Sequence, residues 1–221
     1  MSLQSRLAIR FGLAIPAMSA LLFLPAGSLR FWQGWLYLIL FFSASLFFAI
    51  YFLRRDPQLL ERRLETKEPV RTQRLFKTLW IPLWVCGFAI PGVDFRIGWS
   101  AAPGWLTLLS EALLLAAYFL IFLVLRANRF ASSVVRVEKQ QQVISSGPYR
   151  LVRHPMYSAI LILILFTPTA LGSYLALPVF ALLIPLLVLR LLNEERILRN
   201  ELHGYSGYCL RTRFRIVPLL Y

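Results

Sequence analysis

The residues of this chain that could do chemistry fall in two short polar segments. The first, residues 147–157, reads Gly-Pro-Tyr-Arg-Leu-Val-Arg-His-Pro-Met-Tyr, and the second is Asn193-Glu194-Glu195-Arg196. The stretch between them is almost uncharged and has the length of a helical hairpin, so both segments should return to the same membrane surface. Acidic, basic and aromatic side chains gathered at one face of a membrane protein predict a site for a polar cofactor that acts on a substrate arriving from lipid.

The composition predicts the class of protein. The 221 residues are 58% hydrophobic and only 15% charged, with a mean hydropathy of +0.65, whereas a soluble domain is about 45–50% apolar. We therefore expect an all-α, polytopic membrane protein. The net charge of +14 is typical of cytoplasmic loops rich in Lys and Arg, which attract anionic lipids, and it does not require a nucleic-acid partner. Two cysteines, two histidines and the absence of zinc-binding spacing, a P-loop or a GxGxxG motif predict no disulfide framework and no metal.

A membrane span needs about 20 apolar residues, and this criterion predicts about six transmembrane helices. They cover Leu7–Leu24, Phe31–Leu53, Thr78–Val93, Trp105–Leu125, Met156–Leu171 and Tyr174–Leu192. The third and fifth are short and contain prolines, so tilting or kinking is expected. The fifth and sixth are joined only by Gly172-Ser173, which predicts a tight antiparallel hairpin.

The loop charges predict the orientation. Basic residues gather near the N-terminus and in 54–77, 126–153 and 190–215, whereas only Arg30 and Arg96 fall on the other side. The positive-inside rule then places both termini in the cytoplasm, in a bacterial inner membrane or the endoplasmic reticulum. Residues 54–77 are expected to form an amphipathic connector on the membrane surface. The C-terminal region is expected to leave the bilayer as a helix that breaks near Gly204.

Within the first polar segment, Pro155 suits the first position of a helix. Arg153 and His154 then lie just before that helix, whose N-terminus favours an anion, and Tyr149 and Tyr157 add ring faces and hydroxyl groups. The alternative is a basic interfacial anchor with flanking tyrosines, and for Arg150 this alternative is equally favoured.

The acidic pair offers a second set of candidates. Adjacent helix residues point about 100° apart, so at most one of Glu194 and Glu195 is expected to face a site squarely. Surface pairs at i,i+4 spacing, Arg190 with Glu194 and Glu195 with Arg199, are the alternative. An acid inside a span, such as Glu111, is a functional hypothesis by default, but its place near the outer end favours snorkelling or pairing with Arg96.

The order of these segments resembles the isoprenylcysteine carboxyl methyltransferase family and, more distantly, the phospholipid N-methyltransferases. The similarity runs from Asn128 to Pro218. It includes the two polar segments, Leu198, and the closing pattern Gly204-Tyr205, Tyr208, Arg211, Arg213 and Pro218. The N-terminal helices match only in general character. The resemblance implies a membrane enzyme that uses S-adenosylmethionine, with N-terminal helices in residues 1–125 and a methyltransferase core in residues 126–221 that includes the hairpin 156–192.

The resemblance also implies roles for individual residues. Cofactor binding is expected from Gly147, Pro148, Tyr149, Arg153, His154, Pro155, Tyr157, Glu194 and Glu195. Catalytic roles are expected for Arg190, near the acceptor, and for Glu195. Glu194 or Glu195 would receive the methionine ammonium group, and Glu195→Gln is expected to abolish cofactor binding without affecting folding. The acceptor would be a lipophilic small molecule or a prenylated substrate.

The chain departs from the family pattern at Ala159, where glycine is usual, and at His203, which precedes Gly204 in place of phenylalanine. Three alternatives remain open. A phospholipid N-methyltransferase shares much of the motif, but an amine acceptor needs a base. An NADPH-dependent ene reductase of the sterol type shares the Arg-His-Pro motif, although Glu194-Glu195 fits the methyltransferases better. The third alternative is a non-enzymatic membrane scaffold or transporter subunit; polar residues deep in the spans would favour transport, but few are present because the polar groups cluster at one interface.

Overall fold

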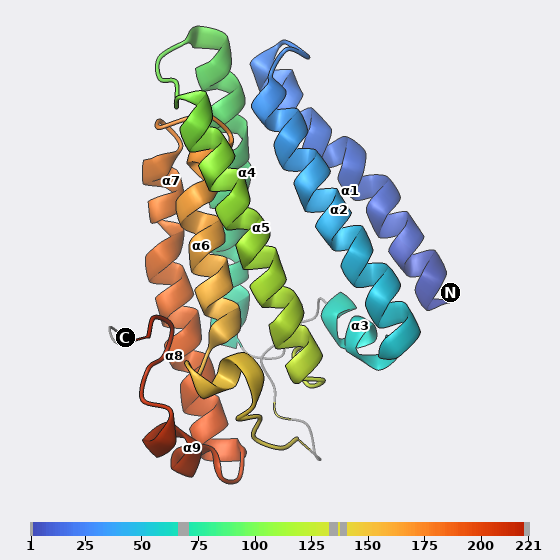
Figure 1. Ribbon diagram of the computed structural model, residues 1–221, viewed down its shortest axis with the longest axis vertical. Coiled ribbons are helices and arrows are strands. Elements are labelled where there is room, and N and C mark those ends of the chain that lie inside the picture. The colour runs from blue at the N-terminus through green and yellow to red at the C-terminus, as the bar shows by residue number, and fades with distance from the viewer. Residues whose placement is uncertain (1, 66–70, 133–136, 138–140, 219–221) are drawn as a thin grey trace.

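The computed structural model describes residues 2–65, 71–132, 137 and 141–218. Within these ranges every regular element is helical, and no strand occurs (Figure 1). The elements are α1 (Leu3–Ala26), α2 (Trp32–Arg55), α3 (Pro57–Leu64), α4 (Arg71–Ile97), α5 (Gly104–Ala127), η1 (Gly147–Arg150), α6 (Pro155–Ala170), α7 (Leu177–Ala181), α8 (Leu183–Glu201) and α9 (Tyr205–Arg211).

The expected multi-pass, all-helical architecture is confirmed. Five helical segments are long and apolar enough to cross a membrane, namely α1, α2, residues 78–97 of α4, α5, and α7 with α8. The remaining expected span, the fifth, corresponds to the shorter apolar helix α6. Its length follows from its ends, because Pro155 occupies the first turn and Gly172 adopts a φ of 73°, a left-handed conformation that stops the helix.

Three of the predicted segments differ from the expectation: the third span, the connector before it and the sixth span. The third span was predicted over Thr78–Val93, but α4 runs from Arg71 to Ile97 and continues through both prolines. The predicted connector over 54–77 was therefore too long. Its amphipathic helix, α3, ends at Leu64, and the last part of the predicted connector, residues 71–77, belongs to α4. Residues 66–70 lie outside the described ranges. The sixth span is also interrupted at Leu182, between α7 and α8.

Hydrogen bonds within the bundle fix α6 against its neighbours. Helix α5 packs most extensively on α6, where the Ser110 and Thr169 hydroxyl oxygens lie 2.7 Å apart and the Thr107 hydroxyl donates to the Thr169 carbonyl at 3.2 Å. Asp94 of α4, 1% exposed, accepts hydrogen bonds from the Ser100 and Ser173 hydroxyls and ties down the α6–α7 turn. These contacts hold the far end of α6, so its N-terminus is presented in one position.

Glu111 contradicts the expectation for an outer-end acid. It is 6% exposed, and both carboxylate oxygens are buried without a hydrogen-bond partner among the described residues. The prediction that it snorkels or pairs with Arg96 is therefore wrong. Helix α5 turns the Glu111 side chain toward the neighbouring helices of the bundle. The polar residues along one helix do not reveal the direction in which this side chain points.

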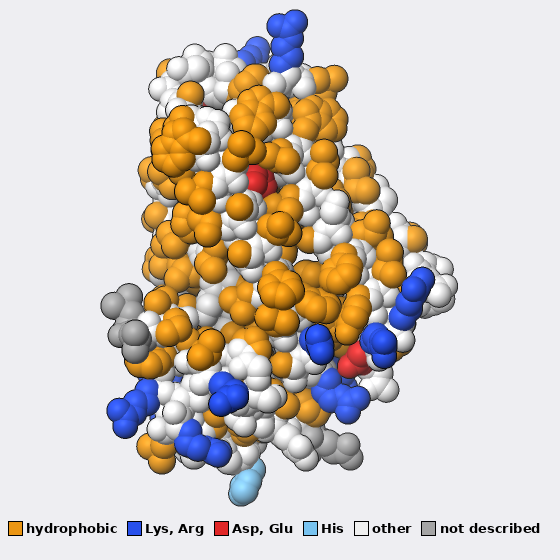
Figure 2. Space-filling view, viewed as in Figure 1, with side chains coloured by type: hydrophobic (Ala, Val, Ile, Leu, Met, Phe, Trp, Pro, Cys, Tyr) orange, Lys and Arg blue, Asp and Glu red, His pale blue; other side chains and the backbone are white. Residues whose placement is uncertain are grey.

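Lys and Arg side chains gather at the lower end of the molecule in the orientation of Figure 2. The same end contains α3, the start of α6, the end of α8, and α9 (Figure 1). Arg30 and Arg96 lie near the opposite end, at the start of α2 and the end of α4. The fold therefore brings the two polar segments of the sequence together at the basic end of the bundle.

Candidate functional site

A cavity of about 420 Å³ opens at the basic end of the bundle. Its walls come from both halves of the chain, including α3, α4, the residues after α5, the start of α6, α8 and α9. The polar and aromatic lining residues are Arg63, Phe76, Trp80, Asn128, Phe130, Ser132, Gln141, Gln142, Tyr149, Arg153, His154, Tyr157, Arg190, Glu194, Tyr205 and Tyr208. An apolar wall of Ile160, Leu186 and Leu187 continues into the spans. The site thus joins a polar chamber to the apolar bundle.

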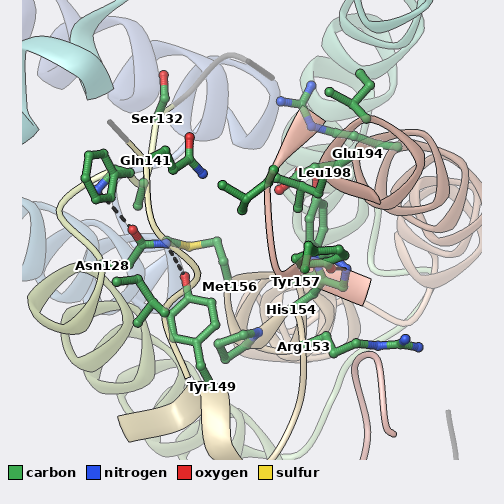
Figure 3. Close-up of a pocket in the computed structure, with 18 of the residues that line it drawn as sticks. Asn128, Ser132, Gln141, Tyr149, Arg153, His154, Met156, Tyr157, Glu194 and Leu198 are labelled. Atoms are coloured by element: carbon green, nitrogen blue, oxygen red, sulfur yellow. Dashed lines mark hydrogen bonds between the residues drawn. The ribbon is translucent and has the colours of Figure 1, made fainter. Parts of the chain in front are cut away.

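Tyr149 and Asn128 form one side of the chamber (Figure 3). The Asn128 amide donates to the Tyr149 hydroxyl at 2.9 Å, and the Asn128 oxygen accepts from the Phe130 N–H at 3.0 Å. Burial raises the pKa of the Tyr149 hydroxyl well above its ordinary value. Tyr149 therefore stays neutral and offers a ring face and a hydroxyl group to a ligand.

The C-terminal tail fixes the Arg153-His154 segment. The N–H groups of Arg153 and His154 donate to the carbonyls of Phe214 and Arg215, each at 2.9 Å. The Tyr208 hydroxyl donates to the Tyr149 carbonyl at 2.7 Å, and the His154 Nε2 lies 3.3 Å from the Tyr205 hydroxyl. These contacts explain why the tail tyrosines accompany the motif in the sequence, because they hold its backbone in place.

The helix N-terminus offers fewer free donors than expected. The N–H groups of Tyr157 and Ser158 both bond to the His154 carbonyl, at 3.0 and 3.2 Å, and Pro155 has no N–H. The dipole of α6 still favours an anion here, but side chains must supply most of the hydrogen bonds to a ligand.

The two adjacent acids lie in different environments. Glu194 lines the cavity and accepts a 2.6 Å hydrogen bond from the Tyr157 hydroxyl. Glu195 is 3% exposed and is not one of the lining residues. Its carboxylate lies 2.9 Å from the Arg153 Nη1, 2.8 Å from the Arg215 Nε and 3.4 Å from the Arg199 Nη2. Helix α8 therefore turns Glu194 toward the cavity and Glu195 toward the tail.

Most of the predicted site residues meet at the cavity. Tyr149, Arg153, His154, Pro155, Tyr157, Arg190 and Glu194 all line it. Gly147, Pro148 and Glu195 do not, among the residues that the structure describes. Gly147 has a φ of 57°, which favours glycine, and Pro148 follows it in η1, so both shape the turn that presents Tyr149.

The sequence analysis missed several lining residues. Tyr205 and Tyr208 stand in the closing pattern quoted for the family resemblance, so their place in that pattern was a usable signal. Gln141 and Arg63 carried no such signal, because one lies in an irregular loop and the other on a helix far away in sequence. Residues 133–136 and 138–140 of that loop lie outside the described ranges.

The burial of His154 leads to a prediction about pH. Burial is the largest cause that lowers the pKa of its imidazole below 6.5, against the opposing effect of Glu194 and Glu195. The unfolded chain then binds a proton more readily than the native protein, so stability should fall as pH drops below about 6.5, by at most about 1.4 kcal/mol per pH unit. Thermal melts of detergent-purified protein between pH 7.5 and 5.5 should show a smaller fall for His154→Gln. His203→Gln, at an exposed position, should lose as much stability as the parent over this pH range. Identical dependence of the melting temperature on pH for the parent, His154→Gln and His203→Gln would refute the role of His154 in this pH dependence.

Comparison with known proteins agrees with this geometry. A search of the curated proteins found no match to the chain. Residues 106–200 match the family model described as the isoprenylcysteine carboxyl methyltransferase (ICMT) family. The matched segment contains α6, all of α8 except Glu201, both polar segments and much of the cavity wall. The resemblance predicted from the sequence is confirmed over residues 106–200, which are similar to the isoprenylcysteine carboxyl methyltransferase family, and it indicates a membrane methyltransferase.

Proposed function

We propose that this protein is an S-adenosylmethionine-dependent methyltransferase that esterifies the carboxylate of a lipophilic, isoprenylcysteine-like acceptor within the membrane. The observation that carries the proposal is the position of Glu194. This acid faces a cavity that has polar walls at the basic end of the bundle and an apolar wall formed by the spans. The family match over residues 106–200 supports the same reaction class.

The chemistry of the lining residues fits this cofactor. Small-molecule sites commonly have volumes of about 300–1,000 Å³, and the cavity has about 420 Å³. Glu194 can pair with the methionine ammonium, the side-chain amides of Asn128 and Gln141 can bind ribose hydroxyls, and tyrosine rings can face adenine or the sulfonium cation. The Nε of Arg153 is buried and has no hydrogen-bond partner in the part of the chain that the structure describes, which leaves a donor for a carboxylate.

When bound, the cofactor would supply a methyl group carried on a cationic sulfur. An oxygen of the acceptor carboxylate would bond to the methyl carbon as the bond between that carbon and the sulfur breaks. The products would be a methyl ester and a neutral thioether. No proton moves, so the protein needs no general base. Glu194 and Tyr157, joined by their hydrogen bond, orient the amino-acid end of the cofactor. Arg190 holds the acceptor carboxylate, and the surrounding side chains exclude water. Positioning of the two reactants then supplies most of the rate.

The orientation in the membrane belongs to the same proposal. The cavity lies at the end where Lys and Arg gather (Figure 2), and the positive-inside rule assigns that end to the cytoplasm. Both termini would then be cytoplasmic, which gives the site access to a soluble cofactor.

Calorimetry on detergent-purified protein tests the proposal. S-adenosylmethionine should bind and NADPH should not. Methyl transfer from labelled cofactor to N-acetyl-S-farnesylcysteine should exceed transfer to phosphatidylethanolamine. Binding of NADPH alone would support the ene reductase, transfer to the amine alone would support the N-methyltransferase, and binding of neither cofactor by folded protein would support the scaffold.

A further inference from the structure

Helix α3, outside the segment that matches the family, is firmly attached beside the cavity. Asp56 caps its N-terminus by accepting from the Leu59 N–H at 3.1 Å. Its apolar face of Leu59, Leu60 and Leu64 is buried. At its other end, the Arg10 guanidinium of α1 donates to the Leu64 carbonyl at 2.6 Å, where a cation is favoured by the helix dipole. The helix is therefore a fixed part of the bundle that can position a side chain.

The two adjacent arginines of α3 have different surroundings. Arg62 donates to the Arg129 carbonyl at 3.0 Å and lies over the Phe130 ring; it is not one of the lining residues. Arg63 donates to the Ser132 carbonyl at 3.3 Å and lines the cavity. The pair thus supplies one arginine at the cavity and one beside it on the same helix.

The charges around the cavity favour an additional anion. Among the described lining residues Glu194 is the only acid, whereas Arg63, Arg153 and Arg190 are all basic. Arg153 already pairs with Glu195. Burial, and then the nearby charge of Arg190, lowers the pKa of the Arg63 guanidinium, although arginine remains charged in proteins. Two guanidinium groups facing one cavity repel each other, and an anionic ligand between them would relieve this repulsion.

We propose that Arg63 and Arg190 together form the anion-binding pair for the acceptor carboxylate, so that Arg63 determines the preference for acidic acceptors. The inference rests on the proposed function. Figure 3 places Ser132, the partner of Arg63, on the side of the cavity across from Glu194. The cofactor's own carboxylate shares a carbon with its ammonium group and must stay near Glu194. The anion nearer to Arg63 is therefore the acceptor's.

The experiment compares two probes in the presence of S-adenosylmethionine, N-acetyl-S-farnesylcysteine and its neutral carboxamide. The unsubstituted parent should bind the acid more tightly than the amide. Arg63→Gln should reduce this acid-to-amide preference at least tenfold and leave the affinity for S-adenosylmethionine within about twofold. Arg63→Lys, which retains the charge, should keep part of the preference. Arg62→Gln, the matched control on the same helix, should keep all of it.

Each other outcome separates the inference from the proposed function. A parent that binds S-adenosylmethionine without distinguishing acid from amide overturns the inference alone, as does an Arg63→Gln variant that retains the full preference. If Arg63→Gln does not fold, the inference is tested with Arg63→Lys instead. An acid-to-amide preference of Arg63→Lys that is identical to the parent's overturns the inference. A parent that binds no S-adenosylmethionine overturns the proposed function and the inference with it.

Discussion

Replacing Glu194 by glutamine should weaken S-adenosylmethionine binding by about 100-fold. Removing one partner of a buried, hydrogen-bonded charge pair costs about 2–5 kcal/mol, and a 100-fold change in affinity corresponds to about 2.7 kcal/mol. Glutamine keeps the shape of the side chain and can still accept a hydrogen bond from the Tyr157 hydroxyl. In the parent this hydroxyl lies 2.6 Å from the Glu194 carboxylate. The loss would therefore report the missing charge. Calorimetric titration of the purified variant measures it.

Two comparisons locate the effect. Methylthioadenosine lacks the amino-acid end of the cofactor, so the parent and Glu194→Gln should bind it equally well. Glu201→Gln, at an exposed position on the same helix, should bind S-adenosylmethionine as the parent does. If methylthioadenosine affinity fell as much as that of the full cofactor, the variant would have altered the shape of the cavity, and Glu194 would lose its assigned role.

Hydropathy predicted the helices well because membrane spans are defined by a strong, local physical requirement. The spans and the break near Gly204, which adopts a φ of 83°, could be predicted from the sequence. The start of α4 could not, because Arg71–Lys77 is polar and its helix forms as an extension of the span. The division of the chain at residue 126 stays a prediction, and the cavity takes Arg63 and Trp80 from the N-terminal part.

The site was predicted as a set of residue types, and its internal assignment required the fold. The 100° separation of adjacent helix residues correctly implied that Glu194 and Glu195 face different surroundings. It could not indicate which one faces the cavity, because that depends on how α8 is rotated against α6 and the tail. The predicted pair between Glu195 and Arg199 is present at 3.4 Å, but the closer contacts of Glu195 come from Arg153 and Arg215, which are distant in sequence. Long-range pairs of this kind have no periodic signal.

These contacts reverse the expected effect of Glu195→Gln. Rather than removing a ligand for the cofactor, the substitution should leave Arg153, which is 7% exposed, as a buried charge without its counterion. Breaking a buried ion pair in this way costs about 3–5 kcal/mol, which in a protein of this size lowers the melting temperature by about 10 °C. Thermal melts should detect the loss, whereas S-adenosylmethionine affinity well below the melting temperature should change far less than in Glu194→Gln. Unchanged stability with lost cofactor binding would restore Glu195 to the site.

Double-mutant cycles can apportion the stabilisation among the three arginines around Glu195. Coupling with Arg153 should be the largest, because both side chains are buried and their atoms lie 2.9 Å apart. Coupling with Arg199 should be at most about 1 kcal/mol, because that side chain is 46% exposed at 3.4 Å and exposed pairs are screened by water. Arg215, 29% exposed, should fall between them. Equal coupling energies at all three positions would mean that Glu195 responds to the overall positive field of this end of the bundle. Coupling energies that decrease from Arg153 to Arg215 to Arg199 would mean that Glu195 holds the C-terminal tail against the Arg153-His154 segment. In that case Glu195 also holds the cavity wall in place.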